Sequence, residues 1–227
     1  MANDEIWEVF EPSLPLLGAT YGRAKVRMVA LGLRDGGLVV VSPGSRCDAA
    51  RAALEKWGKP RFLLAPNHFH NAGLAEWKRA YPDAEVVASP VAHARLKKQV
   101  TSLTHVGDLS ALSAALPSGA RVFGPPMAKQ GEAWLAVDRG DLHALAVCDA
   151  IANLEKVEWM FRLVGFRAKL MTNPLFKRFF LKSKAEYKRW MLAELDAHPP
   201  NLFIPAHGTV SRGADVADQL RRVTESA

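Results

Sequence analysis

The sequence is poor in cysteine, with only Cys47 and Cys148 among its 227 residues. The two cysteines lie far apart in the chain, and neither belongs to a Cys-x-x-Cys pair. This distribution excludes the disulfide framework of a small secreted protein, and it excludes a zinc ribbon. We therefore expect two free thiols that are buried or half-buried.

Long apolar runs are also missing from the chain. No run approaches the roughly 20 residues that are needed to span a bilayer as a helix. The N-terminal sequence MANDEIWEVF is acidic and lacks the basic and apolar regions of a signal peptide. These absences predict a cytoplasmic location.

The composition is that of a folded protein. Hydrophobic residues make up 49% of the chain and charged residues 23%, which argues against disorder. A chain of this length is sufficient for one domain of ordinary α/β size. We therefore expect a single α/β domain over residues 1–227.

Positive charge is concentrated in one segment of the chain. The formal net charge is +7, whereas residues 156–189 alone contain ten basic and two acidic residues and carry +8. The rest of the chain is therefore close to neutral. This distribution argues against a general nucleic-acid-binding surface, and no specific nucleic-acid partner is expected.

Alternation of apolar segments and turn residues predicts a mixed α/β order. Strands are expected at residues 6–10, 26–33, 38–41, 62–65, 85–88, 132–137, 141–147 and 202–204, and helices at 49–57, 74–80 and 214–223. Glycine-containing turns after 33 and 137 predict hairpins, and Asp48 is a plausible cap of the first helix. The strand–helix–strand order over 62–88 predicts parallel pairing.

The basic segment is predicted to form a helical insertion around residues 155–192. Its second half places apolar residues near one helical stripe. These are Phe176, Phe179, Phe180, Ser183, Tyr187, Trp190 and Met191. The preferred interpretation is a helical insertion that packs this stripe on the core. The alternatives are a basic lid that attracts anionic substrates, or contact with a membrane surface or a nucleic acid.

Four polar side chains follow short apolar strands. His68 and His70 come after 62–65, Asp149 after 141–147 and His207 after 202–204. Side chains at strand ends converge in sheet-based α/β proteins, and imidazole and carboxylate groups are metal ligands. Alternatively, the two histidines lie in a surface turn, Asp149 caps a turn and His207 is structural. The other histidines, His93, His105, His143 and His198, lack paired spacing and are expected to be ordinary.

These motifs resemble those of the metallo-β-lactamase superfamily. The matching motifs are Asn67-His68-Phe69-His70, Cys148-Asp149 and Pro205-Ala206-His207-Gly208. The order of the elements matches over nearly the whole chain. The resemblance implies a four-layer αββα sandwich, in which two mixed β-sheets are flanked by helices.

The chain departs from the family motif at several ligand positions. Ala72 and Gly73 replace the Asp-His half of the signature, and residues 125–131 contain no histidine. An acidic residue of the family is also replaced near Ser42. The resemblance therefore implies one divalent ion, zinc being preferred, with His68, His70, Asp149 and His207 as ligands. Ala72 leaves the general base unassigned, because the adjacent Asn71 cannot act as one.

The resemblance implies a metal-dependent hydrolase-like protein that acts on a small-molecule substrate, anionic if the basic segment forms a lid. Asn67 and Asn71 would be substrate contacts. The alternative is an inactive superfamily member that keeps the fold as a binding or scaffold module. Peripheral membrane contact through the basic segment is the less favoured possibility. The sequence leaves the substrate and the oligomeric state open.

Overall fold

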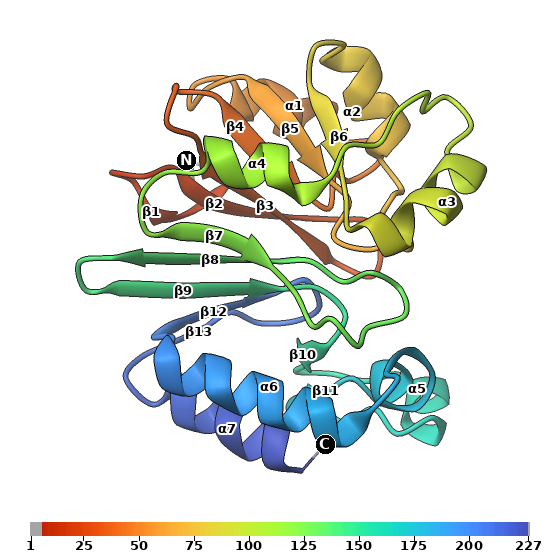
Figure 1. Cartoon of the computed structure of the whole chain (residues 1–227), viewed down its shortest axis with the longest axis vertical. Helices are drawn as coiled ribbons and strands as arrows, with labels where there is room; N and C mark the ends of the chain where they lie inside the picture. The colour runs from red at the N-terminus through yellow and green to blue at the C-terminus, as the bar shows by residue number, and fades with distance from the viewer. Residues whose placement is uncertain (1–5, 227) are drawn as a thin grey trace. The chain divides into compact units, whose positions relative to one another are not determined.

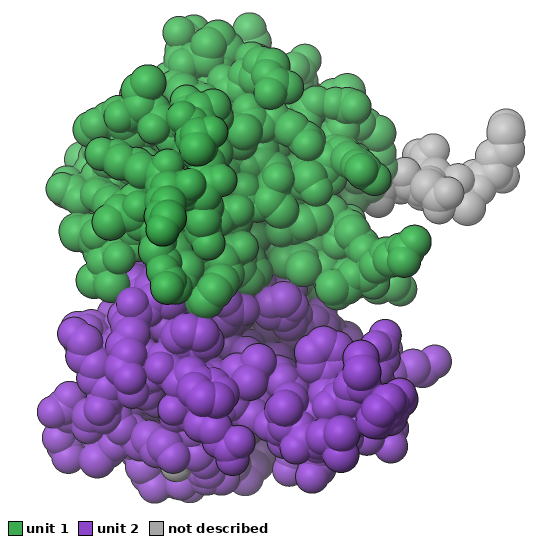
Figure 2. All heavy atoms as spheres, turned by 90° about the vertical axis from the view of Figure 1, so that its right-hand side faces the viewer, with its two compact units in different colours: residues 1–118 green, residues 119–227 purple. Residues whose placement is uncertain are grey.

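The computed structural model describes residues 6–226 and contains two compact units (Figure 2). Unit 1 is Met1–Ser118 and unit 2 is Gly119–Ala227. Each unit contains a mixed β-sheet with helices (Figure 1), which confirms the prediction of two mixed sheets flanked by helices. The single domain over residues 1–227 stays a prediction.

Unit 1 is built on a six-stranded sheet in the order β1-β2-β3-β4-β5-β6. Its strands are β1 Glu8–Glu11, β2 Leu16–Tyr21, β3 Val26–Gly32, β4 Leu38–Val41, β5 Pro60–Leu64 and β6 Glu85–Val87. Its helices are α1 Asp48–Leu54, α2 Leu74–Ala80, α3 Pro90–Gln99 and α4 Leu109–Ala115. Strands β1 to β4 are antiparallel, and β4 to β6 are parallel. The hairpin β3–β4 and the parallel β5–β6 pair are therefore confirmed.

The core of unit 1 forms on one face of this sheet. Alternate strand residues such as Met28, Val40 and Leu63 pack with apolar residues of α1, α2 and α3, because a period of two directs them to the same side. Trp77 of α2 is fully buried, and its Nε1 donates a hydrogen bond of 2.9 Å to the Gly44 carbonyl. This bond fixes α2 against the turn that follows β4.

Unit 2 contains a five-stranded sheet in the order β13-β12-β9-β8-β7 and a separate β10–β11 pair. The strands are β7 Ala120–Phe123, β8 Trp134–Arg139, β9 Leu142–Val147, β10 Ile151–Asn153, β11 Leu170–Thr172, β12 Leu202–Pro205 and β13 Ser211–Arg212. The helices are α5 Trp159–Leu163, the π-helical turn η1 Phe176–Phe180, α6 Lys184–Ala197 and α7 Val216–Glu225. The β8–β9 hairpin is confirmed, and β12 pairs with β9 in parallel.

Helices α6 and α7 cover one face of the unit 2 sheet (Figure 1). The stripe predicted on the basic segment is only partly correct. Phe176, Tyr187 and Met191 are buried in this core, but Phe179 is exposed. One continuous helix does not form, since the backbone becomes extended at Leu181, directly after η1. Helix α6 then begins after Ser183, whose hydroxyl caps it by accepting a hydrogen bond from the Glu186 amide.

Several elements differ from the sequence-based expectations. Strands β2, β7, β10, β11 and β13 and helices α3 and α4 were not expected. Asp48 is the first helical residue of α1 and makes no capping bond there. Short strands and weakly amphipathic helices give little periodic signal. Both cysteines are free and buried, as expected. Among the described residues, no helix is long and apolar enough to cross a membrane.

Candidate metal centre

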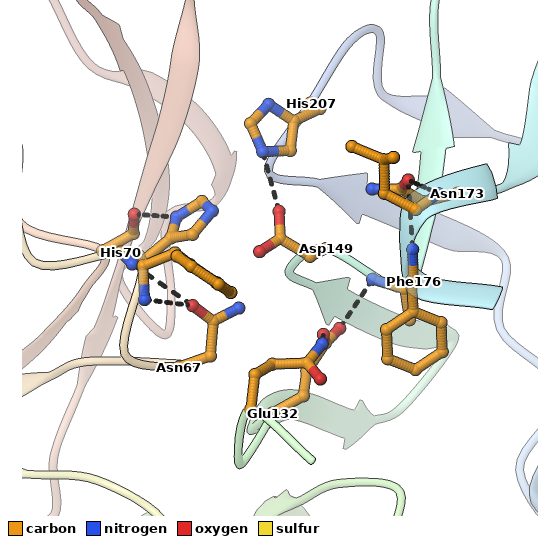
Figure 3. Close-up of polar contacts among 12 residues, drawn as sticks. Asn67, His70, Glu132, Asp149, Asn173, Phe176 and His207 are labelled. Carbon is orange, nitrogen blue, oxygen red and sulfur yellow. Dashed lines mark hydrogen bonds and ion pairs between the residues drawn. The ribbon is translucent and has the colours of Figure 1, made fainter. Parts of the chain in front are cut away.

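The His68–His70 loop of unit 1 begins just after β5. The side chain of Asn67 shapes this loop, because its Oδ1 accepts hydrogen bonds from the amides of Phe69 (2.8 Å) and His70 (3.2 Å) (Figure 3). Such a side-chain-to-backbone turn is the usual role of asparagine after a strand. Asn71 donates to the His68 carbonyl at 2.6 Å and to Gln99. The role of both asparagines as substrate contacts stays a prediction.

His70 is oriented by Ser42, the residue that follows β4. The Ser42 hydroxyl and the His70 Nδ1 are 2.7 Å apart, and both side chains are buried. Ser42 adopts a left-handed backbone with φ 56°, which is unusual for a residue other than glycine. Its amide also bonds the Leu64 carbonyl, so the position is held by β5. Since Nδ1 is held by Ser42, a metal ion would bind His70 through Nε2.

His68 has a different partner. Its Nε2 lies 3.1 Å from the Arg95 Nη1, where the guanidinium of α3 donates to the ring nitrogen. The ring also contacts Phe69, with 4.1 Å between the ring centroids. A metal ion bound to Nε2 would have to displace the guanidinium. The two histidines of one motif are therefore not equivalent.

The loop closes against the turn after β4 at Gly73. The Gly73 amide donates to the Pro43 carbonyl, and a Cβ on Gly73 would lie 2.1 Å from the Gly44 oxygen. No side chain fits at this separation without a backbone shift. Any residue other than glycine at position 73 would therefore require this turn to move.

Unit 2 brings Asp149 and His207 together (Figure 3). Asp149 follows β9 and His207 follows β12, and these two strands are parallel neighbours. Their carboxyl ends therefore lie side by side, as the strand-end argument predicted. The His207 Nε2 is 3.0 Å from the Asp149 Oδ1, and both side chains are partly buried.

Gly208 fixes the backbone that carries His207. Its φ is +103°, and a Cβ there would lie 1.8 Å from the Asn153 oxygen, so only glycine fits. The Asn153 amide donates to the His207 carbonyl, and the Thr209 amide donates to the Asn153 carbonyl. The Pro-Ala-His-Gly motif therefore positions the histidine through a glycine that permits close approach of β10.

Glu132 supports the turn that carries Asp149. This carboxylate is buried, and its Oε1 accepts from the Trp134 Nε1 and the Ala150 amide, each at 2.8 Å (Figure 3). Its Oε2 accepts from Gln130 at 3.0 Å. From the other side, the Asn173 amide donates to the Ala150 carbonyl. Burial raises the pKa of the neighbouring Cys148 thiol well above its usual range, and the charges of Asp149 and Glu132 add to this effect.

The donor set of unit 2 fits a divalent ion. Two nitrogen or oxygen ligands of a tetrahedral zinc ion, with bonds of about 2.0 Å, lie about 3.3 Å apart. The Asp149 Oδ1 and the His207 Nε2 are 3.0 Å apart, which is a hydrogen-bond distance, and an ion bound by both would replace the shared proton. An imidazole and a carboxylate also match the chemistry of zinc sites.

Three supporting residues were not predicted from the sequence, namely Ser42 as the partner of His70, Arg95 and Glu132. Of these three, only Glu132 had a signal in the sequence, because it is an acidic residue at the start of the otherwise apolar predicted strand 132–137. Of the histidines expected to be ordinary, His143 and His198 both contact Asp138, at 2.9 and 3.2 Å. His93 contacts the Ala88 carbonyl.

Comparison with known proteins gives a structural match. No family model and no curated protein matches the chain. A DIM-1 metallo-β-lactamase structure is similar with a TM-score of 0.62 and 11% identity, covering 97% of this chain and 96% of the other. A metallo-β-lactamase from Erythrobacter litoralis gives 0.63 and 12%, covering 100% and 99%. The one from Hirschia baltica gives 0.62 and 10%, covering 96% of each chain.

Identities this low carry information about the fold alone. The coverage nevertheless extends over nearly all of both sequences. The strand-end motifs and the structural match thus agree, and the chain has the metallo-β-lactamase fold.

Proposed function

We propose that this protein is a metal-dependent hydrolase that uses one divalent ion, preferably zinc. His70, Asp149 and His207 would be its protein ligands. Three protein ligands and one water form the usual catalytic zinc site. His68 would become a fourth ligand only by exchanging its contact with Arg95. The proposal requires the loop of unit 1 and the pair of unit 2 to bind the same ion.

The observation that carries the proposal is the Asp149–His207 pair. Its two proposed ligand atoms are 3.0 Å apart. The Glu132 carboxylate holds the turn of Asp149, and the main chain of Asn153 holds the loop of His207. Hydrogen bonds that orient ligands are typical of metal centres. The Ser42–His70 bond gives the same kind of support to the third ligand.

When bound, the ion would lower the pKa of a coordinated water and polarise a carbonyl or phosphoryl group of the substrate. The chain itself supplies the orientation of the ligands. Ser42 fixes the His70 ring, and Glu132 fixes the turn before Ala150. A small-molecule ester, amide or phosphoester is the substrate class that suits this chemistry.

Zinc titration of metal-free protein tests the proposal. Isothermal titration and elemental analysis should give about one zinc per chain. His70→Ala, Asp149→Asn and His207→Ala should each weaken zinc binding by at least about tenfold. His105→Ala, which changes an exposed histidine, is the matched control and should bind like the parent.

Two results would refute the proposal. One is that the parent protein binds no zinc or manganese and gains no thermal stability from them. That result would favour the inactive scaffold. The other is that variants in unit 2 lose zinc while His70→Ala does not, because the ion would then not be shared. With zinc binding established, hydrolysis of ester, lactam and phosphodiester probes by the zinc-loaded protein identifies the bond that is cleaved.

A further inference from the structure

An exposed excursion lies between β10 and β11 in unit 2. These two strands pair antiparallel, Ile151 with Thr172 and Asn153 with Leu170, and residues 154–169 connect them. We name residues 154–169 the excursion. It contains the short helix α5.

The outer side of the excursion is apolar. Trp159 is 70% exposed, Leu163 77% and Met160 55%. Phe161 and Val164 are also exposed, so that five of the six residues from 159 to 164 are large, apolar and solvent-facing. Contiguous apolar surface of this kind usually marks an interaction site, whereas single exposed apolar residues are ordinary.

The excursion is held in place by a small core that it shares with β11 and the residues after it. Val157, Phe166 and Met171 are buried together, and Leu175 packs against them. The Phe161 and Phe166 rings meet edge to face at 5.7 Å. The Arg162 Nε and the Arg167 Nη1 donate to carbonyls of the excursion. The apolar side chains are therefore presented by a folded support.

Basic side chains accompany this apolar surface. The excursion contains four basic residues, Lys156, Arg162, Arg167 and Lys169, against Glu155 and Glu158, and therefore carries a net +2. Lys177, Arg178 and Lys182 follow on η1 and beyond it. Within the part of the chain that the structure describes, Lys156, Lys169, Arg178 and Lys182 form no salt bridge. The charges of these four residues are therefore available to an anionic partner.

We infer that the excursion binds the surface of an anionic phospholipid bilayer. Tryptophan and leucine side chains insert at the level of the headgroups, while lysine and arginine contact the phosphates. With only five residues, α5 is far too short to span a membrane and would lie in the interface. Charge favours a lipid surface over a second copy of the protein, because two cationic surfaces would repel each other. An anionic bilayer surface attracts the basic side chains and also accepts the apolar ones.

Vesicle flotation of the full-length protein tests the inference. We expect binding to vesicles of phosphatidylcholine and phosphatidylglycerol, and little binding to pure phosphatidylcholine. The double variant Trp159→Ser/Leu163→Ser should weaken binding by about tenfold or more, because it removes two exposed apolar anchors. Val91→Ser, at an exposed valine of α3, is the matched control and should bind like the parent.

Charge is tested separately with Lys156→Glu/Lys169→Glu, which should abolish binding to anionic vesicles, while Lys97→Glu/Lys98→Glu on α3 should not. Circular dichroism and thermal melting should be unchanged in all variants, since every altered side chain is exposed. The inference fails if the parent does not float with anionic vesicles, or if Trp159→Ser/Leu163→Ser floats as well as Val91→Ser. It also fails if ultracentrifugation shows that this double variant abolishes a dimer, since the apolar surface would then serve a second copy.

Discussion

The two units hold their proposed ligands in different ways. In unit 1, each histidine of the motif contacts a side chain from another element, His70 with Ser42 and His68 with Arg95. In unit 2, Asp149 and His207 contact each other. Close backbone approach at Gly208 fixes the His207 loop, and the buried Glu132 carboxylate fixes the Asp149 turn. In unit 1, the two histidines of the motif therefore differ only through the side chains that they contact. Unit 2 keeps an aspartate and a histidine together through the backbone approach that Gly208 permits and through one buried carboxylate.

The largest expected effect concerns backbone geometry in unit 2. Gly208→Ala should lower the free energy of unfolding by about 3 kcal/mol. Alanine would be strained at a φ of +103°, and its Cβ would overlap the Asn153 carbonyl. Gly140→Ala is the control, with positive φ and open space around it, and should cost about 1 kcal/mol. Urea unfolding measures both. Equal costs for the two variants would remove the special role of the Gly208 contact.

The second prediction concerns the buried carboxylate that holds the Asp149 turn. Glu132→Gln should cost about 2 kcal/mol of stability, because three hydrogen bonds to a buried charge are altered. Glu194→Gln breaks the half-buried pair with Arg121 and should cost less than about 1 kcal/mol. Thermal and urea unfolding distinguish them. If Glu132→Gln proved as mild as the control, Glu132 would not be what fixes this turn.

The third prediction tests the side-chain partner of His70 in unit 1. Ser42→Ala removes the hydroxyl that orients the ring and should weaken zinc binding by about tenfold. Ser45→Ala, three residues away, should leave the affinity unchanged. Isothermal titration gives both constants. Unaltered zinc affinity in Ser42→Ala would mean that His70 needs no orientation or is not a ligand.

The smallest effect is expected at Arg95. Arg95→Ala removes a cation from His68 and should strengthen zinc binding by about threefold, since like charges repel. Lys98→Ala, on the same helix, is the control. His68→Ala should keep most of the zinc affinity. Should His68→Ala instead lose as much affinity as His70→Ala, the distinction between the two histidines would be abandoned.

Much of the fold could be predicted from the sequence where the pattern was strong. Leu38–Val41 and Leu74–Ala80 match their strand and helix at both ends, because each is a clear apolar or amphipathic segment bounded by turn residues. That Asp149 and His207 follow strands and lie near each other was also predicted from sequence, whereas the parallel β9–β12 pairing and the direct contact were not. Local pattern was sufficient in these places.

The remainder depends on tertiary contacts that no local pattern encodes. Arg95 reaches His68 from α3, a helix that was not expected, and its apolar periodicity is weak. The left-handed backbone of Ser42 has no signal in a serine. The break between η1 and α6 is set by the Ser183 cap, which ended a stripe that looked continuous. The predicted cytoplasmic location stays a prediction.

One contact in unit 2 has a mechanical consequence. Asn153 ends β10, immediately before the excursion, and its main chain bonds both the His207 carbonyl and the Thr209 amide. A displacement of the backbone at the start of the excursion would therefore strain the hydrogen bonds that hold the peptide of His207. A partner bound at the excursion would thereby be linked through Asn153 to the backbone of a proposed metal ligand.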